Sequence, residues 1–275
     1  MSLEEPLMKM IDNLSNSVPI PDNEYLGEDG FLHCSKCHTK TQTTIEIFGK
    51  TRKVRCICAC RQKEVDKRKR EEEAKEIERR RTICFSGTNM KDWCFEKDDR
   101  KNLKLSELSR KYANNFDKYR KEGRGLLLYG NCGTGKTFYA ACIANELITK
   151  GYMVQMTNFA TLVNRIQSTF EKEEVINDLD RYSLLIIDDL GAERRSEYMQ
   201  ETVFNIIDKR YRSGKPLIIT TNLTIGEIKR PENVNFARIY DRIIERCMPV
   251  EVAGNSRRRG KARDNFETMR KELGL

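Results

Sequence analysis

Residues 130–137 have the types and the spacing of a loop that binds phosphate groups. They read Gly-Asn-Cys-Gly-Thr-Gly-Lys-Thr. Glycines let backbone N–H groups approach a phosphate chain, the lysine reaches its β- and γ-phosphates, and the threonine hydroxyl is a ligand for Mg²⁺. We therefore predict a P-loop that binds ATP together with Mg²⁺. The predicted nucleotide-binding residues are Gly130, Asn131, Cys132, Gly133, Thr134, Gly135, Lys136, Thr137 and Phe138.

Two later segments end in polar residues that would complete such a site. The apolar run 184–187 ends in Asp188 and Asp189, and the run 216–221 ends in Asn222. We predict that Asp188 holds Mg²⁺ with Thr137, directly or through water, and that Asp189 orients or activates the attacking water. We predict that Asn222 senses the γ-phosphate or places the water. The alternatives are that Asp189 only donates or accepts hydrogen bonds beside the site and that Asn222 only ends a strand.

A second group of chemically active residues lies near the amino terminus. Cys34 and Cys37 form a C-x-x-C pair, and Cys56, Cys58 and Cys60 form C-x-C-x-C. The intervening segments 44–48 and 53–55 predict a hairpin, so the arrangement is typical of a zinc ribbon. Four thiolates in a tetrahedron suit Zn²⁺, and a segment this small needs a metal to fold. We predict that Cys34 and Cys37 bind zinc with two of the other three cysteines, and the spacing leaves open which two.

The P-loop requires a strand before it and a helix after it, and the flanking residues predict both. Apolar residues 125–129 predict a buried strand, and the apolar spacing over 138–150 predicts a helix. Further strand and helix patterns alternate along the chain: strands over 152–156, 184–189 and 216–222, and helices over 159–170, 199–211 and 236–246. This order predicts an α/β fold, a parallel sheet sandwiched by helices that binds nucleotide at the carboxyl ends of its strands.

Changes in composition divide the chain into three predicted parts. Residues 1–60 form a partner-binding segment with the zinc module, and its first part contains a weak helical pattern at residues 7–14. Residues 61–82 are nearly all charged and predict a solvated helical linker, and residues 83–275 form the ATPase domain. Residues 254–260 predict a basic turn, and the charged tail from Lys261 predicts a surface helix.

The overall composition limits the classes of protein to consider. The net charge of +9 suits a nucleic acid or an acidic partner. No segment reaches the roughly 18 consecutive apolar residues of a membrane span, and the amino terminus does not have the pattern of a secretory signal. We therefore expect a cytoplasmic protein without a membrane partner, in which the ten cysteines bind metal or stay reduced.

The P-loop segment 125–137, the acidic segment 184–193 and the segment 215–223 together resemble the DnaC/DnaI helicase loaders and the related IstB transposition ATPases. The resemblance spans residues 83–260 and implies an AAA+ ATPase. It implies that ATP-bound subunits self-associate and deliver a DnaB-type replicative helicase to single-stranded DNA, and that assembly or this DNA stimulates ATP hydrolysis. The amino-terminal module would contact the helicase.

The resemblance also implies roles for individual residues. Asn222 matches sensor 1, and Arg242 matches the arginine finger that acts on a neighbouring subunit. Arg258 is the candidate for sensor 2, although Arg257 stands where the family has an aromatic residue, so the choice between them stays open. From aromatic stacking and charge, we predict contacts to DNA at Phe159, Arg165 and Phe170.

Two other functions remain open at this stage. One is an IstB-like helper ATPase for transposition, against which the zinc module argues. The other is a zinc-dependent nucleic-acid adaptor in which bound ATP only stabilises the fold.

Overall fold

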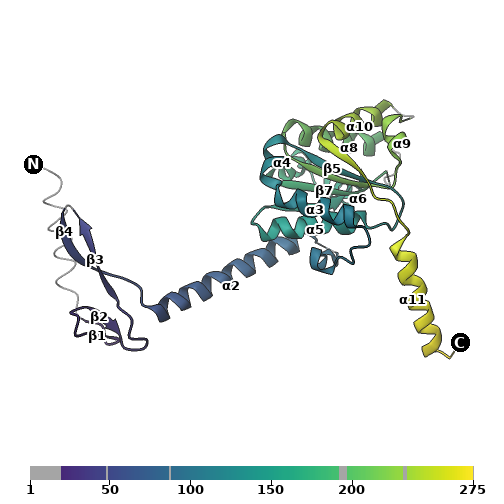
Figure 1. Cartoon of the computed structure of the whole chain (residues 1–275). Helices are drawn as coiled ribbons and strands as arrows, with labels where there is room; N and C mark the ends of the chain where they lie inside the picture. The colour runs from purple at the N-terminus through teal and green to yellow at the C-terminus, as the bar shows by residue number, and fades with distance from the viewer. Residues whose placement is uncertain (1–19, 48, 87, 192–196, 232–233, 275) are drawn as a thin grey trace, which may run out of the picture. The chain divides into compact units, whose positions relative to one another are not determined.

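The computed structural model describes residues 20–47, 49–86, 88–191, 197–231 and 234–274. The chain divides into two compact units, Met1–Lys75 and Glu76–Leu275. Helix α2 (Ala59–Cys84) runs through the boundary between them. Figure 1 shows the elements of both units. The helical pattern predicted at residues 7–14 lies outside the described residues.

A five-stranded parallel sheet forms the centre of the larger unit, with the strand order β6-β7-β8-β5-β9. This finding confirms the predicted fold class. The strands are β5 (Gly125–Tyr129), β6 (Val154–Asn158), β7 (Leu184–Leu190), β8 (Leu217–Thr221) and β9 (Cys247–Glu251).

Helices follow or precede each of these strands (Figure 1). They are α3 (Leu103–Asn114), α4 (Phe116–Glu122), α5 (Lys136–Thr149), α6 (Phe159–Gln167), α7 (Lys172–Asp178), α8 (Glu197–Arg212), α9 (Ile225–Lys229), α10 (Val234–Arg246) and α11 (Arg257–Glu272). Short 3₁₀ turns lie at Met90–Asp92, Phe95–Lys97 and Leu179–Arg181.

The side chains of the central strands alternate between two hydrophobic cores. On β7, Leu184 and Ile186 pack into the core that contains the apolar residues of α5, while Leu185 and Ile187 pack into the core shared by α6, α8 and α10. Successive residues of a strand point to opposite faces, so a strand that is apolar at every position must be covered on both. The continuous apolar runs in the sequence therefore indicate a sheet between two helical layers.

The sequence-based prediction missed strand β9 at one edge of the sheet. Its segment contains Pro249, which cannot donate a ladder hydrogen bond, and its outer residues Met248 and Glu251 are exposed. Proline is tolerated in an edge strand, where one side of the backbone has no partner strand. The proline within the short apolar segment Cys-Met-Pro-Val argues against a strand in the sequence, although the edge position accommodates it.

The prediction of a basic turn over residues 254–260 is wrong from Arg257 onward. Helix α11 begins at Arg257, and the side chain of Ser256 accepts a hydrogen bond from the backbone N–H of Arg259. Serine is a favourable N-cap because its hydroxyl satisfies a free N–H of the first turn.

The described part of the smaller unit, residues 20–47 and 49–75, contains two hairpins and the start of α2. Strands β1 (Glu24–Leu26) and β2 (Leu32–Cys34) pair antiparallel. Strands β3 (Gln42–Ile47) and β4 (Lys50–Arg55) form the hairpin that the sequence predicted.

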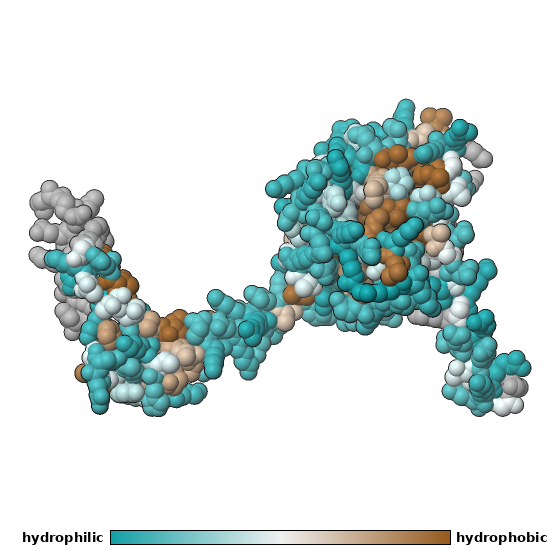
Figure 2. All heavy atoms as spheres, in the orientation of Figure 1, coloured by the Kyte–Doolittle hydropathy of each residue, from teal (hydrophilic) through white to brown (hydrophobic). Residues whose placement is uncertain are grey.

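Helix α2 includes the predicted linker 61–82 and has charged side chains on all sides, with Cys84 as its one buried residue. Figure 2 shows its surface as almost entirely hydrophilic on the face drawn. None of the helices in the described ranges combines the length and the apolar character that a membrane span requires.

Candidate nucleotide site and cysteine cluster

Glycines give the loop between β5 and α5 its shape. Gly130, Gly133 and Gly135 have φ angles of 134°, 80° and 106°, which residues with a Cβ rarely adopt. A Cβ on Gly133 would lie 2.2 Å from the Ser256 hydroxyl oxygen, and the Gly133 carbonyl accepts a hydrogen bond from the Arg257 N–H. The start of α11 therefore packs directly against the tip of the P-loop.

The Lys136 ammonium is enclosed by acceptors at the start of α5. Its Nζ donates to the carbonyls of Gly130 at 2.6 Å and Asn131 at 2.8 Å, and to the Asn222 side-chain oxygen at 2.8 Å. Burial lowers the pKa of Lys136, and the charge of Arg258 acts in the same direction, while Cys132, Asp189 and Asp188 oppose it. The cation is thus held between the loop and the carboxyl end of β8.

The other loop residues have less specialised surroundings. The Thr134 hydroxyl is buried and donates to the Asn131 carbonyl at 2.9 Å. Cys132 is exposed. The ring of Phe138 lies 5.9 Å from that of Trp93, measured between centroids.

Two hydroxyl groups donate to one carboxylate oxygen where a Mg²⁺ ion is predicted. Thr137 Oγ1 lies 2.9 Å from Asp188 Oδ1, and Thr220 Oγ1 lies 2.5 Å from the same oxygen. Burial raises the pKa of Asp188, and the two hydroxyl hydrogen bonds counteract this effect. A threonine hydroxyl beside a carboxylate offers the oxygen ligands that Mg²⁺ prefers, so these residues fit the ion.

Asp189 is held in a backbone conformation that is unusual for a residue with a side chain. Its φ angle is 60°, and the ladder between β7 and β8 is irregular between Ile187 and Leu190. The Asp189 N–H donates to Thr220 Oγ1 at 2.9 Å, and Asn222 Nδ2 donates to Asp189 Oδ1 at 2.7 Å. Strained conformations of this kind concentrate at functional sites.

Asn222 links Lys136 at the start of α5 to Asp189 of β7 through its side-chain amide. Its side-chain oxygen accepts from Lys136 while its nitrogen donates to Asp189. Thr220, which contacts both aspartates, was not predicted from the sequence. It is one of two adjacent threonines at the end of β8, and its contacts lie on the neighbouring strand β7.

The two arginines at the start of α11 differ in their surroundings. Arg257 forms an ion pair with Asp99 at 3.1 Å and lies over the ring of Tyr139. Arg258 is exposed, and its charge influences the pKa of both Lys136 and Asp188. The Arg257 guanidinium also lies beside the P-loop, with its Cζ and Nε 3.7 Å from where a Cβ on Gly135 would lie, so both arginines are placed near the candidate site.

Arg242 is bound to α8 of its own chain and not to its own P-loop. Its Nε donates to Asp208 Oδ1 at 2.9 Å. Arg246 lies over the ring of Tyr211, as Arg242 also does, and Arg238 is exposed. Among these arginines of α10, Arg242 has an acidic partner on the neighbouring helix α8.

The three residues predicted to contact DNA have different surroundings. Phe159 is only 2% exposed and belongs to the core, so the prediction that it stacks on bases is wrong. Arg165 forms an ion pair with Asp178 at 3.5 Å, and Phe170 is fully exposed.

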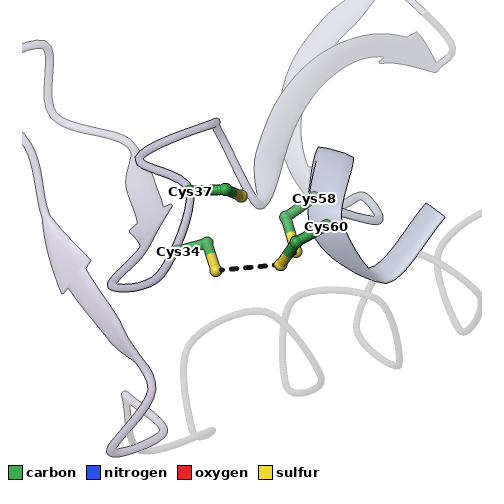
Figure 3. Close-up of side chains that lie close together, drawn as sticks. All are labelled: Cys34, Cys37, Cys58 and Cys60. Atoms are coloured by element: carbon green, nitrogen blue, oxygen red, sulfur yellow. Dashed lines mark hydrogen bonds between the residues drawn. The ribbon is translucent and has the colours of Figure 1, made fainter. Parts of the chain in front are cut away.

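Four cysteine sulfurs of the smaller unit gather at one point, as Figure 3 shows. The ligand atoms of Cys34, Cys37, Cys58 and Cys60 lie within 4.8 Å of one another. The Sγ of Cys60 is 3.7 Å from that of Cys34 and 3.3 Å from that of Cys58. Zinc–sulfur bonds of about 2.3 Å in a tetrahedron place sulfurs about 3.8 Å apart, so this donor set fits Zn²⁺.

Cys56 is the candidate ligand that the structure leaves out of the cluster. Its N–H donates to the Thr41 carbonyl, and its Sγ lies 3.6 Å from the Lys40 carbonyl oxygen. Cys56 continues the backbone pairing next to β4, whereas Cys58 and Cys60 lie on either side of the residue that begins α2.

Hydrogen bonds within the cluster shift the pKa values of two of its thiols. A hydrogen bond from the Thr39 hydroxyl lowers the pKa of Cys37 to about 5, and the neighbouring Cys58 raises that of Cys60 to about 12.

Comparison with known proteins places this arrangement among nucleotide-binding proteins. The family described as "IstB-like ATP binding protein" matches residues 88–265. The replicative helicase loader DnaI of Bacillus subtilis (strain 168) is 30% identical over 150 residues, which are 50% of this chain and 48% of that protein. The replicative helicase loader DnaC of Escherichia coli (strain K12) is 31% identical over 127 residues, 44% of this chain and 51% of that protein.

A relative with a different description matches to a similar degree. The putative insertion sequence ATP-binding protein y4iQ/y4nD/y4sD of Sinorhizobium fredii is 31% identical over 151 residues, 53% of this chain and 50% of that protein. The chain thus spans about half the length of these curated relatives.

Solved structures share the fold of the larger unit. A crystal structure of DnaI superposes with a TM-score of 0.56 at 23% identity, covering 65% of this chain and 99% of that one. A crystal structure of the DnaC helicase loader gives a TM-score of 0.52 at 22% identity, covering 61% of this chain and all of that one.

Proposed function

Because the chain belongs to the family of IstB-like ATP-binding proteins, we propose that it is an ATPase that loads a DnaB-type replicative helicase onto single-stranded DNA. The observation that carries the ATPase part is the hydrogen-bonded path from Lys136 through Asn222 to Asp189. The helicase part rests on the relatives that are named helicase loaders.

The proposed chemistry assigns each residue of the site one task. The loop N–H groups and Lys136 bind the β- and γ-phosphates, and Thr137 and Asp188 hold Mg²⁺, which would neutralise charge on the phosphates. Asp189, oriented by Asn222, positions the attacking water. Arg258 adds positive charge from α11, and Arg242 acts on the nucleotide of a neighbouring subunit.

The smaller unit has a separate task in this proposal. Zinc held by Cys34, Cys37, Cys58 and Cys60 would stabilise the unit, and the unit would recognise the helicase. The charged surface of α2 supports a role as a helical linker between this unit and the ATPase domain. We retain the division at residues 1–60, 61–82 and 83–275 as part of the proposal.

A loading assay tests the proposal directly. The replicative helicase of the same source is incubated with circular single-stranded DNA, with or without the chain and ATP, and bound helicase is separated by gel filtration. We expect the chain and ATP together to increase the amount of helicase on the circle, and Lys136→Ala to remove this increase. Equal loading with and without the chain would contradict the proposal, and an N-terminal pull-down of helicase would locate the contact.

A second function is favoured by the relative described as an insertion sequence ATP-binding protein. A transposition helper would bind its transposase and would leave helicase loading unchanged. The clustered cysteines lie outside residues 88–265, which the family matches, and as a zinc module they favour the helicase loader over the transposition helper. Tight ATP binding without turnover, with or without single-stranded DNA, would instead indicate a nucleic-acid adaptor.

A further inference from the structure

Arg242 of α10 is held in one place by an acidic residue of the neighbouring helix α8. Its Nε donates to Asp208 Oδ1 at 2.9 Å, and its Nη1 donates to the Arg238 carbonyl at 3.0 Å. The side chains of Arg242 and Asp208 are 25% and 14% exposed. The pair is therefore partly shielded from water, where a charge-assisted hydrogen bond is stronger than at the open surface.

Aromatic rings of α8 complete the surroundings of the guanidinium group. Its Cζ lies 4.8 Å from the ring centroid of Phe204 and 5.7 Å from that of Tyr211. Positions 204, 208 and 211 are spaced by four and three residues, so they share one face of the helix. The carboxylate and both rings thus contact the arginine from the same side, and the rings add cation–π attraction.

The second oxygen of Asp208 limits how the carboxylate can move. Oδ2 accepts from Arg212 Nε at 2.8 Å, while Oδ1 accepts from Arg242. A rotation of the carboxylate would break at least one of these ion pairs. The Arg212 side chain is 75% exposed, so its own pair contributes little to stability and provides a control.

These contacts leave part of the Arg242 guanidinium available. A guanidinium carries five N–H groups. The hydrogen bonds that Arg242 makes within the described part of the chain use Nε and one N–H of Nη1. The N–H groups of Nη2 and the second one of Nη1 therefore remain, and the edge between Nη1 and Nη2, the outer edge of the planar group, suits two oxygens of one phosphate group.

On the basis of the proposed function, we propose that Asp208 is a positioning residue, which fixes Arg242 so that its outer edge meets the triphosphate bound by the neighbouring copy of this chain. Ordering an unrestrained arginine costs rotamer entropy. Because Asp208, Phe204 and Tyr211 order the side chain before assembly, that cost does not oppose the interaction with phosphate.

Assemblies mixed from two variants of the chain test the positioning role of Asp208 in one kind of copy at a time. A Lys136→Ala copy presents Arg242 but cannot use its own nucleotide, and an Arg242→Ala copy binds nucleotide but presents no arginine. Each variant alone is expected to be inactive, and the mixture is expected to recover ATP turnover in the presence of single-stranded DNA. Asp208→Asn is then added to one copy or the other, and thermal melting verifies that each variant is folded.

We expect Asp208→Asn in the Lys136→Ala copy to reduce the recovered turnover by about 10- to 100-fold, the scale of a misplaced catalytic group. In the Arg242→Ala copy the same change has no arginine to position, so turnover should stay at the level of the starting mixture. Asp208→Glu in the Lys136→Ala copy should restore part of the loss. Arg212→Ala in that copy should have no effect, because the pair between Asp208 and Arg242 remains.

Three results would overturn the positioning role. An equal loss in both arrangements would show that Asp208 only stabilises α8. A rise in turnover would show that Asp208 withholds Arg242 from the neighbour. A starting mixture without turnover, from copies that each remain folded, would instead refute the action of Arg242 between subunits, and with it the positioning role.

Discussion

Replacing Thr220 by valine removes one buried hydroxyl that contacts both aspartates of the candidate site. The Thr220 side chain is 1% exposed. Its Oγ1 donates to Asp188 Oδ1 at 2.5 Å and accepts from the Asp189 N–H at 2.9 Å. Valine has nearly the same shape, so the substitution leaves no cavity and isolates the effect of the two hydrogen bonds.

The expected loss follows from these two contacts. The hydrogen bond to the Asp188 carboxylate contributes about 1.5–3 kcal/mol, and the one from the N–H of the exposed residue Asp189 contributes about 0.5–1.5 kcal/mol. Together they predict a decrease of about 2–4.5 kcal/mol in the free energy of unfolding. At about 2–4 °C per kcal/mol for a domain of this size, the melting temperature should fall by about 4–18 °C.

Urea and thermal unfolding of the full chain measure this change, with two matched variants. Thr220→Ser keeps the hydroxyl and should lose much less stability. Thr202→Val removes a buried hydroxyl that donates only to the Tyr198 carbonyl within α8, so its cost should stay below about 1 kcal/mol. If Thr220→Val were as stable as Thr202→Val, the hydroxyl would not hold the aspartates as we describe.

Three further predictions concern other parts of the chain. Cys58→Ser should lower bound zinc well below one ion per chain, measured by atomic absorption, whereas Cys56→Ser should keep the full amount. Asp188→Asn should raise the melting temperature at pH 7, because burial raises the pKa of Asp188 and its ionised form therefore destabilises the folded state. The difference in melting temperature should shrink as the pH falls through that raised pKa towards 3.8, since Asp188 then becomes neutral in the folded state. Arg258→Ala should lower ATP turnover about tenfold or more, and Arg257→Ala should lower it less because its charge is paired with Asp99; equal effects would contradict the assignment of Arg258.

The parts of the site that the sequence predicted are those set by local geometry. A loop that wraps phosphate needs glycine at particular backbone angles, and Gly130, Gly133 and Gly135 have such angles. The apolar run before Asp188 is equally local, because a strand covered on both faces needs an apolar residue at every position. Such requirements leave a readable pattern in a single sequence.

Features that depend on contacts between distant segments were not predictable. Thr220 acts through a residue on the neighbouring strand, and the pairing of β7 with β8 is not encoded near it. The choice between Cys56 and Cys58 depends on where α2 begins relative to the hairpin. Phe159 has the composition of a base-stacking residue, yet it lies at the start of α6 and faces the core.

Equilibrium binding of ATP and Mg²⁺ to the Lys136→Ala chain, measured by calorimetry, tests most directly the claim that nucleotide binds between this loop and the two aspartates. The loss of one charged contact to phosphate, about 1.5–3 kcal/mol, predicts a dissociation constant about 10- to 150-fold higher than that of the unsubstituted chain. Lys150, just beyond the other end of α5, donates to the Ala113 carbonyl, so Lys150→Ala should bind ATP normally. Equal affinity of Lys136→Ala and Lys150→Ala would contradict the account.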